Sequence, residues 1–541
     1  MDKIDLQQII NNYPDCVTNG AELKAILLDT YPDMSKAMVN TLVIIVNDGI
    51  AKEILDSEAI TGLDKFRWQK KLEDDYGLSE KVITSGIDMF VECRDYCNPD
   101  DFEIKNGVLI SYKGSYPIVH IPSNVTIIGD KAFYSCSRLT SITIPDSVTS
   151  IGNYSFYGCR ELTSVTIGNS ITSIGNYAFV YCSGLRSITI QESVTSIGDY
   201  SFYGCAGLAR VEWNAVNCTE AGNEKYPIFR GCTNLTTVII GDKVKIIPSY
   251  AFDGCTGLTS IEWNAENCTY AGDYYSPIFS EWTNLTTVII GDKVKVIPSC
   301  AFEGCGELTN IHISSIESWC KIIRKDNLMD HGTRNKKLYI NGEEITELII
   351  PDNVTSIGNS AFRGCTGLTS ITIPDSVTNI GNSAFRGCTG LTSIMIPDSV
   401  TSIGDYAFYG CDKLTNIHIS SIESWCKITG LDNLMRYGSS NKKLYINGEE
   451  ITELIIPDCV TSIGNSAFFG CSELTSVEWN AENCTEAGKD GHLIFLGCPK
   501  VEAVVIGDNV KTIPSKAFKA CRKLTNIYKQ YKILVQNYRV I

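Results

Sequence analysis

The sequence predicts a solenoid of short β-strands preceded by a small all-α domain. Three observations lead to this fold class. A phrase of about 23 residues, such as SVTSIGNYSFYGCRELTSVTIG at 147–168, recurs along most of the chain. Within the phrase, LTSVTI alternates apolar and polar residues with a period of two, as half-buried strands do. The first hundred residues lack the phrase and carry helix-type apolar stripes instead.

Residues 1–98 are predicted to form an acidic helical domain, because residues 1–100 hold 19 acidic and only 10 basic side chains. Ser35 can cap a helix that carries Met38, Leu42 and Ile45 on its apolar side. Ser79 can cap a second helix. This stretch offers no nucleophile–base pair and no metal-ligand spacing, so we expect it to act as an adaptor, an oligomerisation element or a cap.

The repeats are expected to fill residues 123–528. The phenylalanine of each copy defines 13 intervals, of which eight are 23 residues long, three are 27 and two are 60. The intervals of 27 contain WNAxNCTxAG, and those of 60 contain SSIESWCKI followed by NKKLYINGEEITELIIPD. If each 60-residue interval hides one further turn, the solenoid has about 16 turns. Residues 99–122 are predicted to be cap strands at one end, and residues 529–541 a cap at the other.

One turn can be read from its apolar positions, and no sustained 3.6-residue stripe accompanies them, so little or no helix is expected in the array. The dipeptides IP, GD and GN supply the corners. In the representative copy the apolar positions are Val148, Ile151, Phe156, Cys159, Leu162, Val165 and Ile167.

The pattern L-x-x-I-x-I-P-x-x-V-x-x-I-x-x-x-A-F-x-x-C, with phrases such as LTSITIPDSVTSIG at 139–152, resembles the BspA-like leucine-rich-repeat family. The resemblance covers about residues 118–528. It implies a right-handed solenoid from a family whose members mostly bind proteins, often as bacterial surface adhesins. The sequence departs from those adhesins because MDKIDLQQIINNYPDC has neither the basic nor the apolar region of a signal peptide.

Cysteine follows the anchor phenylalanine by three residues in 13 of 14 copies, and Trp282 is the exception. A core-filling group can be exchanged for an indole, whereas a metal ligand or a catalytic thiol cannot. The cysteines are therefore interpreted as a packing ladder. Disulfides are the alternative, since stacked turns lie close enough, but the total of 23 cysteines is odd.

The sequence contains none of the common catalytic or nucleotide-binding motifs. Its histidines and tryptophans offer no catalytic, metal or cofactor site. Three of the five histidines occupy the central position of an I-x-I-type strand several turns apart, too far to share a zinc ion. Surface histidines are expected, with a pair such as His312 and Cys320 as the catalytic alternative. Trp213, Trp263 and Trp479 are expected in the core, with an aromatic rim as the alternative.

The central position of each strand should point away from the core, and its residues are the candidate binding surface. Exposed isoleucine and methionine among acids and histidines are typical of a protein-binding face, although they could also pack beneath the insertions. The candidate protein-binding residues are Glu212, Ile239, Glu262, Ile289, His312, Met395, His418 and Glu478.

The net charge of −16 disfavours nucleic acid and anionic membrane surfaces as partners. No apolar run is long enough for membrane insertion, and together with the missing signal peptide this favours a cytoplasmic location. We expect a non-enzymatic scaffold that binds a protein partner through its strand face. A surface or secreted adhesin is one alternative, and an effector or enzyme with its site in residues 1–98 is another. The sequence leaves the oligomeric state open.

Overall fold

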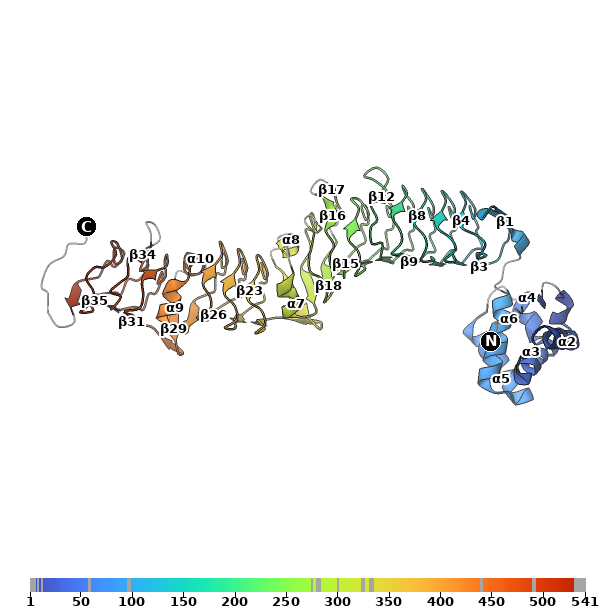
Figure 1. Cartoon of the computed structure of the whole chain (residues 1–541), viewed down its shortest axis with the longest axis horizontal. Coiled ribbons are helices and arrows are strands. Elements are labelled where there is room, and N and C mark those ends of the chain that lie inside the picture. Colours follow the sequence, from blue (N-terminus) through green and yellow to red (C-terminus); the bar gives the residue numbers. More distant parts are fainter. Residues whose placement is uncertain are drawn as a thin grey trace. The chain divides into compact units, whose positions relative to one another are not determined.

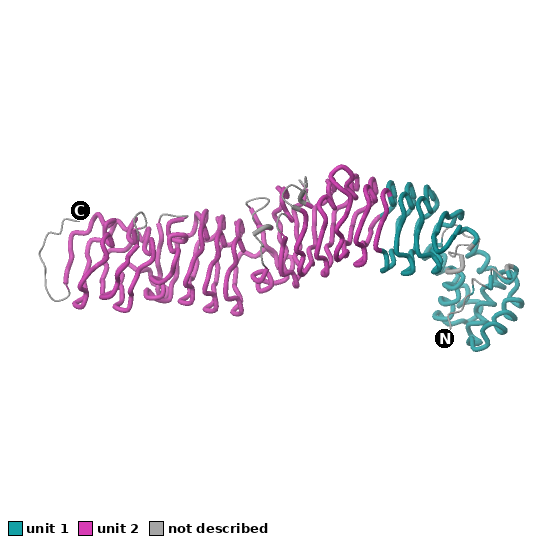
Figure 2. The backbone as a smooth tube through the Cα atoms, turned by 45° about the horizontal axis from the view of Figure 1, so that its top comes forward, with its two compact units in different colours: residues 1–171, 178–185 teal, residues 172–177, 186–541 magenta. Residues whose placement is uncertain are grey.

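The computed structural model contains the predicted solenoid, with about 17 turns of about 23 residues, preceded by a helical region. It describes residues 6, 9–10, 13–56, 60–94, 99–273, 276–278, 284–298, 301–322, 326–329, 335–437, 441–488 and 493–529. Phe279, Trp282, His331, His492 and residues 530–541 lie outside this part. The described part divides into unit 1, residues 1–171 and 178–185, and unit 2, residues 172–177 and 186–541 (Figure 2).

The helical region of unit 1 encloses its own apolar core, which includes Leu42, Ile45, Trp68 and Phe90. The Ser35 hydroxyl accepts a hydrogen bond from the Met38 amide at 3.2 Å, so the predicted cap is confirmed. The helices are η1 (Pro14–Val17), α2 (Gly20–Thr30), α3 (Lys36–Asn47), α4 (Ile50–Asp56), α5 (Gly62–Tyr76), α6 (Glu80–Arg94) and η2 (Pro99–Asp101).

The first turns of the solenoid also belong to unit 1. One side carries the parallel strands β3 (Ile118–His120), β5 (Ser141–Thr143) and β7 (Ser164–Thr166). The other side carries the hairpin of β1 (Phe102–Lys105) and β2 (Val108–Tyr112), followed by β4 (Ile127–Ile128) and β6 (Ser150–Ile151). The ring of Phe156 stacks between Phe133 and Phe179, with centroids 4.9 and 4.8 Å away. The anchor phenylalanines therefore form a continuous apolar ladder inside these turns.

In unit 2 the longer strands form three successive sheets on one side of the turns, which we call the strand face (Figure 1). The eight-stranded sheet contains β9 (Ser187–Ile190), β11 (Arg210–Trp213), β13 (Thr237–Ile240), β15 (Ser260–Trp263), β18 (Thr287–Ile290), β19 (Asn310–Ile313), β20 (Lys337–Ile340) and β21 (Glu343–Glu344). The six-stranded sheet contains β22 (Glu347–Ile349), β24 (Ser370–Thr372), β26 (Ser393–Ile396), β28 (Asn416–Ile419), β29 (Lys443–Ile446) and β30 (Glu449–Glu450). The four-stranded sheet contains β31 (Glu453–Ile456), β33 (Ser476–Trp479), β35 (Ala503–Ile506) and β36 (Asn526–Lys529).

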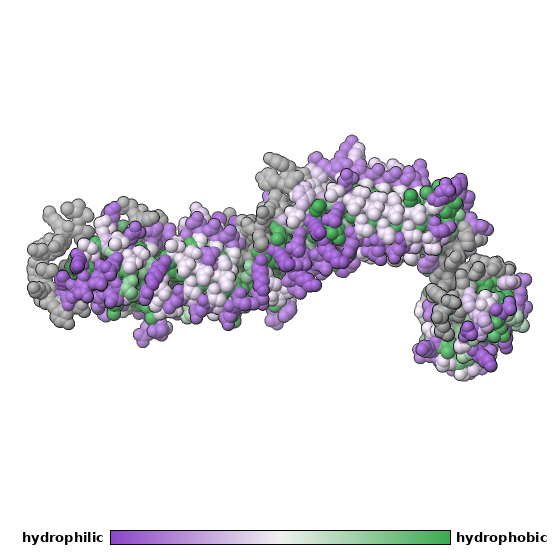
Figure 3. Space-filling view, viewed as in Figure 1, coloured by the Kyte–Doolittle hydropathy of each residue, from purple (hydrophilic) through white to green (hydrophobic). Residues whose placement is uncertain are grey.

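The other side of unit 2 carries mostly two-residue strands. They are β8 (Ser173–Ile174), β10 (Ser196–Ile197), β12 (Glu220–Ala221), β14 (Ile246–Ile247), β16 (Tyr270–Asp273), β17 (Ser276–Pro277), β23 (Ser356–Ile357), β25 (Asn379–Ile380), β27 (Ser402–Ile403), β32 (Ser462–Ile463) and β34 (Glu486–Ala487). The flank of these turns shows mainly residues of intermediate hydropathy between polar borders (Figure 3). The strongly apolar ladders accordingly lie inside the turns.

The array departs from the expectation of little or no helix within the two 60-residue intervals. Here lie α7 (Ile316–Lys321) and α8 (Asp326–Met329), and in the second copy α9 (Ile422–Lys427) and α10 (Asp432–Met435). Ser315 caps α7 and Ser421 caps α9, since each hydroxyl accepts an amide hydrogen bond three residues on. The phrase SSIESWCKI thus begins with a helix cap, and six residues are too few to show a 3.6-residue stripe.

Each 60-residue interval also interrupts the strand face. The hairpins β20–β21 and β29–β30 each end one sheet, and β22 and β31 begin the next. Long-range hydrogen bonds span each interruption: the Trp319 indole donates to the Ala361 carbonyl at 2.8 Å and the Trp425 indole to the Ala467 carbonyl at 3.0 Å. One lysine is buried at each site and donates to a backbone carbonyl, Lys336 to Leu308 and Lys442 to Leu414, both at 2.7 Å.

The ladder cysteines pack in the core and also make a regular hydrogen bond. The thiol of Cys388 donates to the Phe362 carbonyl in the preceding turn at 3.1 Å, and Cys411 donates to the Phe385 carbonyl at the same distance. Burial raises the pKa of the Cys411 thiol to about 12, so the thiol keeps its proton. A small apolar side chain that can also donate explains the preference for cysteine, and these contacts agree with the packing interpretation.

Candidate protein-binding surface

The strand register brings the predicted residues of the eight-stranded sheet into one row across the strands. Glu212 pairs directly with Ile239, Ile239 with Glu262, Glu262 with Ile289, and Ile289 with His312. Because the register is unshifted, all five side chains leave the same face of the sheet.

The other predicted residues belong to separate sheets. Met395 and His418 are paired on neighbouring strands of the six-stranded sheet, and Glu478 lies in the four-stranded sheet between Ile455 and Val505. The eight residues therefore do not form a single patch. The row from Glu212 to His312 is the longest group that the structure brings together.

The row extends to a tyrosine that the sequence analysis missed. Tyr339 on β20 pairs with His312, and the two rings stack with centroids 4.6 Å apart. The same arrangement recurs on β28 and β29, where His418 stacks on Tyr445 at 4.7 Å. Desolvation lowers the pKa of His312, which favours the neutral ring. The repeated LYI at 338–340 and 444–446 has the strand pattern and could have identified both tyrosines.

Exposure differs among the apolar members of the strand face. Ile289 is 39% exposed, Met395 50% and Ile455 55%, in agreement with the predicted outward orientation. Ile239 is only 9% exposed, so its expected exposure was wrong. It lies between the longer side chains of Glu212 and Glu262 and lines the cavity that they share.

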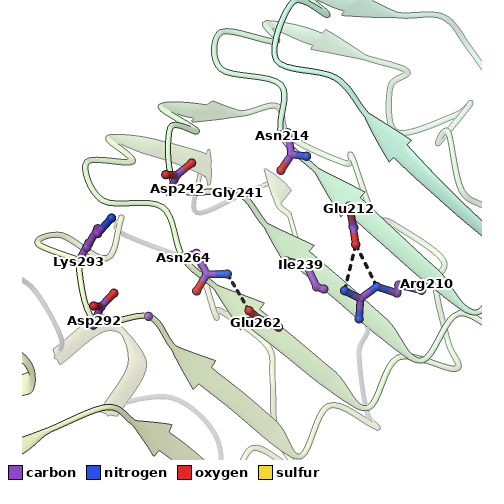
Figure 4. Close-up of a pocket in the computed structure, with 11 residues that line it drawn as sticks. Arg210, Glu212, Asn214, Ile239, Gly241, Asp242, Glu262, Asn264, Asp292 and Lys293 are labelled. Carbon is purple, nitrogen blue, oxygen red and sulfur yellow. Dashed lines mark hydrogen bonds and ion pairs between the residues drawn. The ribbon is translucent and has the colours of Figure 1, made fainter. Parts of the chain in front are cut away.

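That cavity has a volume of about 400 Å³ and lies over β11, β13 and β15 and the turn that follows β18 (Figure 4). Glu212 and Glu262 line it from alternate positions of the row. At the carboxyl ends of the strands, its wall is completed by residues that the sequence analysis did not single out: Asn214, Asp242, Asn264, Asp292 and Lys293.

Two hydrogen-bonded pairs orient the glutamates. The Arg210 guanidinium donates to Glu212 at 3.0 and 3.2 Å from its Nη2 and Nε atoms, and the Asn264 amide donates to Glu262 at 2.8 Å. Glu212 therefore belongs to a partly exposed ion pair, whereas the partner of Glu262 is a neutral amide. The pair of Glu262 and Asn264 recurs in the third copy of the WNAxNC motif, where the Asn480 amide donates to Glu478 at 2.8 Å.

Glycine lies where the asparagines of the WNAxNC motif approach the next turn. A Cβ atom at Gly241 would overlap the Asn214 side chain, and one at Gly291 would overlap that of Asn264. The sequence EWN in one turn is thus matched to IG in the next. Both glycines line the cavity beside these asparagines.

The tryptophans of the motif lie in the core as predicted, since Trp213, Trp263 and Trp479 are fully buried. Among the described residues, no group of three or more His, Cys, Asp or Glu side chains could hold a metal ion. Within the same part of the chain, no helix has the length and apolar character needed to cross a bilayer.

The chain matches the family model of the BspA type leucine-rich repeat region at residues 110–226, 225–325, 333–429 and 439–538. Among solved structures, it is 30% identical to a leucine-rich-repeat protein from Bacteroides ovatus over 69% of this chain and 82% of that one, with a TM-score of 0.33. It is 25% identical to a leucine-rich cell surface protein from Faecalibacterium prausnitzii over 80% and 92%, with a TM-score of 0.25.

No curated protein is similar enough to this sequence to count as a match. The repeat model, in contrast, covers well over half of the chain and agrees with the turn length and the ladders described above. The chain belongs to the family of BspA-type leucine-rich-repeat proteins.

Proposed function

We propose that the chain is a non-enzymatic scaffold that recognises a protein partner through the strand face of its eight-stranded sheet. The supporting observation is the row Glu212–Ile239–Glu262–Ile289–His312, which joins acidic, apolar and aromatic side chains and whose first three members line a cavity. Interfaces between proteins combine such apolar contacts with oriented polar groups. Leucine-rich-repeat families commonly bind proteins, which makes the strand face the first place to test.

The test is affinity capture with the intact chain as bait, combined with cross-linking to locate the contact. The test variant carries Glu212→Lys, Glu262→Lys and Ile289→Lys, three exposed or half-exposed positions where lysine fits without entering the core. The matched control carries Glu478→Lys, because Glu478 has the same asparagine contact in a different sheet. The proposal expects a protein that both wild type and control retain, that the test variant loses, and that cross-links to the eight-stranded sheet.

A second variant separates this proposal from recognition by the helical region. Leu63 and Phe66 are 76% and 60% exposed near the start of α5, so Leu63→Ser with Phe66→Ser should leave the fold intact. A partner lost only with this second variant would place recognition in the helical region. The solenoid would then be a spacer, and the strand-face proposal would be wrong.

A further inference from the structure

The two glutamates of the row are separated by a fixed repeat that constrains what can bind them. Glu212 and Glu262 occupy the same register position two strands apart, with Ile239 directly between them. Neighbouring strands lie about 4.8 Å apart, so the backbone positions of the two glutamates repeat at about 9.6 Å across the strands. Ile289 follows Glu262 by one further strand. Acidic and apolar positions thus alternate along the axis on which the turns stack.

A peptide that follows this axis crosses the strands, so it cannot extend the sheet by strand pairing. In an extended β-peptide, side chains on one face repeat at about 6.7 Å, which does not match the acidic repeat. An α-helix returns to one face after seven residues, or about 10.5 Å. A polyproline II helix returns after three residues at about 9.3 Å, and its backbone needs no partner strand. Of the three regular conformations, polyproline II fits the spacing best.

The net negative charge of the cavity favours a basic ligand. Its lining contains four acidic residues, Glu212, Asp242, Glu262 and Asp292, and two basic ones, Arg210 and Lys293, so the net charge is −4 + 2 = −2. Within the described part of the chain, no lysine or arginine forms an ion pair with Glu262; its partner is the neutral amide of Asn264. A cationic side chain that binds there can form a charge-assisted hydrogen bond with the Glu262 carboxylate.

We propose that this row binds a basic polyproline II segment of a partner protein, with lysine or arginine at every third residue. Cationic side chains at i and i+3 reach Glu212 and Glu262, and apolar residues beside them in the peptide contact Ile289. This identification of the partner rests on the proposed function, since it concerns the same face. It adds the conformation, the sequence period and the charge of the bound segment.

The third copy of the motif provides an internal control. Glu478 has the same asparagine contact as Glu262, but its neighbours in the row are Ile455 and Val505, with Tyr528 two strands away. No second glutamate stands at the two-strand spacing on the described strands of this sheet. The four-stranded sheet therefore lacks the acidic repeat, although its local chemistry is the same.

The experiment measures fluorescence anisotropy of labelled peptides with the full-length chain at low salt. One peptide contains five Pro-Pro-Lys triplets. A second has the same composition, but its lysines alternate at spacings of two and four residues. A third forms a helix with lysines at i and i+7. We expect the triplet peptide to bind about tenfold more tightly than the other two, which corresponds to about 1.4 kcal/mol.

Glu212→Gln with Glu262→Gln should weaken binding of the triplet peptide by at least about tenfold, because each substitution removes a charge-assisted contact. Glutamine still accepts the bonds from Arg210 and Asn264, so the fold is kept. Glu478→Gln should leave binding unchanged. Equal binding of all three peptides would show charge attraction alone, and tighter binding of the helical peptide would show a helical ligand; either result overturns this inference.

The inference and the proposed function can fail separately. If no peptide binds while the strand-face variant still loses a captured protein, the polyproline II inference is wrong and the strand face remains a binding surface. If neither the peptides nor a captured protein depend on the strand face, both are wrong.

Discussion

Replacing the buried Lys442 with methionine should make the stability of the chain less dependent on pH. Lys442 is 1% exposed, and its ammonium group donates to the Leu414 carbonyl at 2.7 Å. Desolvation lowers its pKa from 10.5 to about 8. The unfolded chain therefore holds this proton up to a higher pH than the folded chain does. Between about pH 8 and pH 10.5 the unfolded state binds more protons, so stability rises with pH through that window.

The size of the effect follows from the two pKa values. The penalty for the charged lysine is about 3 kcal/mol at pH 7 and about 1 kcal/mol at pH 10, a change of about 2–3 kcal/mol. Methionine removes this penalty but leaves the Leu414 carbonyl without its donor, at a cost of about 1–3 kcal/mol that does not vary with pH. The sign of the variant's effect on the free energy of unfolding at one pH is therefore less informative than the change of that effect between pH 7 and pH 10.

The assay is thermal unfolding of wild type and Lys442→Met at pH 7 and pH 10. For one cooperative unit of this length, about 2–3 kcal/mol corresponds to about 2–3 °C in Tm. The difference in Tm between variant and wild type should fall by that amount from pH 7 to pH 10. Lys443→Met is the matched control, because Lys443 is partly exposed and pairs with Glu450 at 2.8 Å. An equal difference at both pH values would refute the reasoning that burial penalises the charge of Lys442.

Three other predictions concern the ladders, an exposed thiol and the location. Phe385→Ala removes a fully buried ring stacked at 5.5 and 5.3 Å on its two neighbours, so unfolding should become easier by about 3–5 kcal/mol in denaturant titration; an unchanged midpoint would contradict the ladder. In the native protein iodoacetamide should alkylate the exposed Cys459 and spare the buried Cys388. Glu423 raises the pKa of Cys459, so Glu423→Gln should speed this alkylation at pH 8, as peptide mass spectrometry would show. For the proposed cytoplasmic location, trypsin added to intact cells should leave the chain uncut; cleavage would favour the surface alternative.

Much of the fold could be predicted because every turn buries side chains at the same apolar positions of the repeat. The phenylalanine interval of 23 residues sets the turn, and Phe156 stacks on its neighbours where the phrase predicts. The tryptophans of the 27-residue intervals occupy the isoleucine position of other turns and are buried as expected. The predicted count of about 16 turns agrees with the observed number of about 17, since each 60-residue interval hides at least one further turn as expected.

The candidate surface was predicted in its strand positions but not in its grouping. Alternation along a strand shows which residues point outward, so Glu212, Glu262 and Ile289 were found. It does not show how far a neighbour covers them, and Ile239 proved nearly buried. Nor does it reveal that Arg210 lies against Glu212, or that Asn264 orients Glu262. These contacts depend on side-chain geometry within and between turns.

The sequence by itself determined the period, the inward ladder of phenylalanine and cysteine and the outward row, because each follows from local alternation repeated at a constant interval. Only the tertiary structure decided where the strand face breaks, which glutamates share a cavity and which lysines are buried. The Trp319 indole meets the Ala361 carbonyl 42 residues away, across one of the breaks in the strand face. Such contacts form when the turns stack, and stacking places together residues whose separation in the chain varies with every insertion.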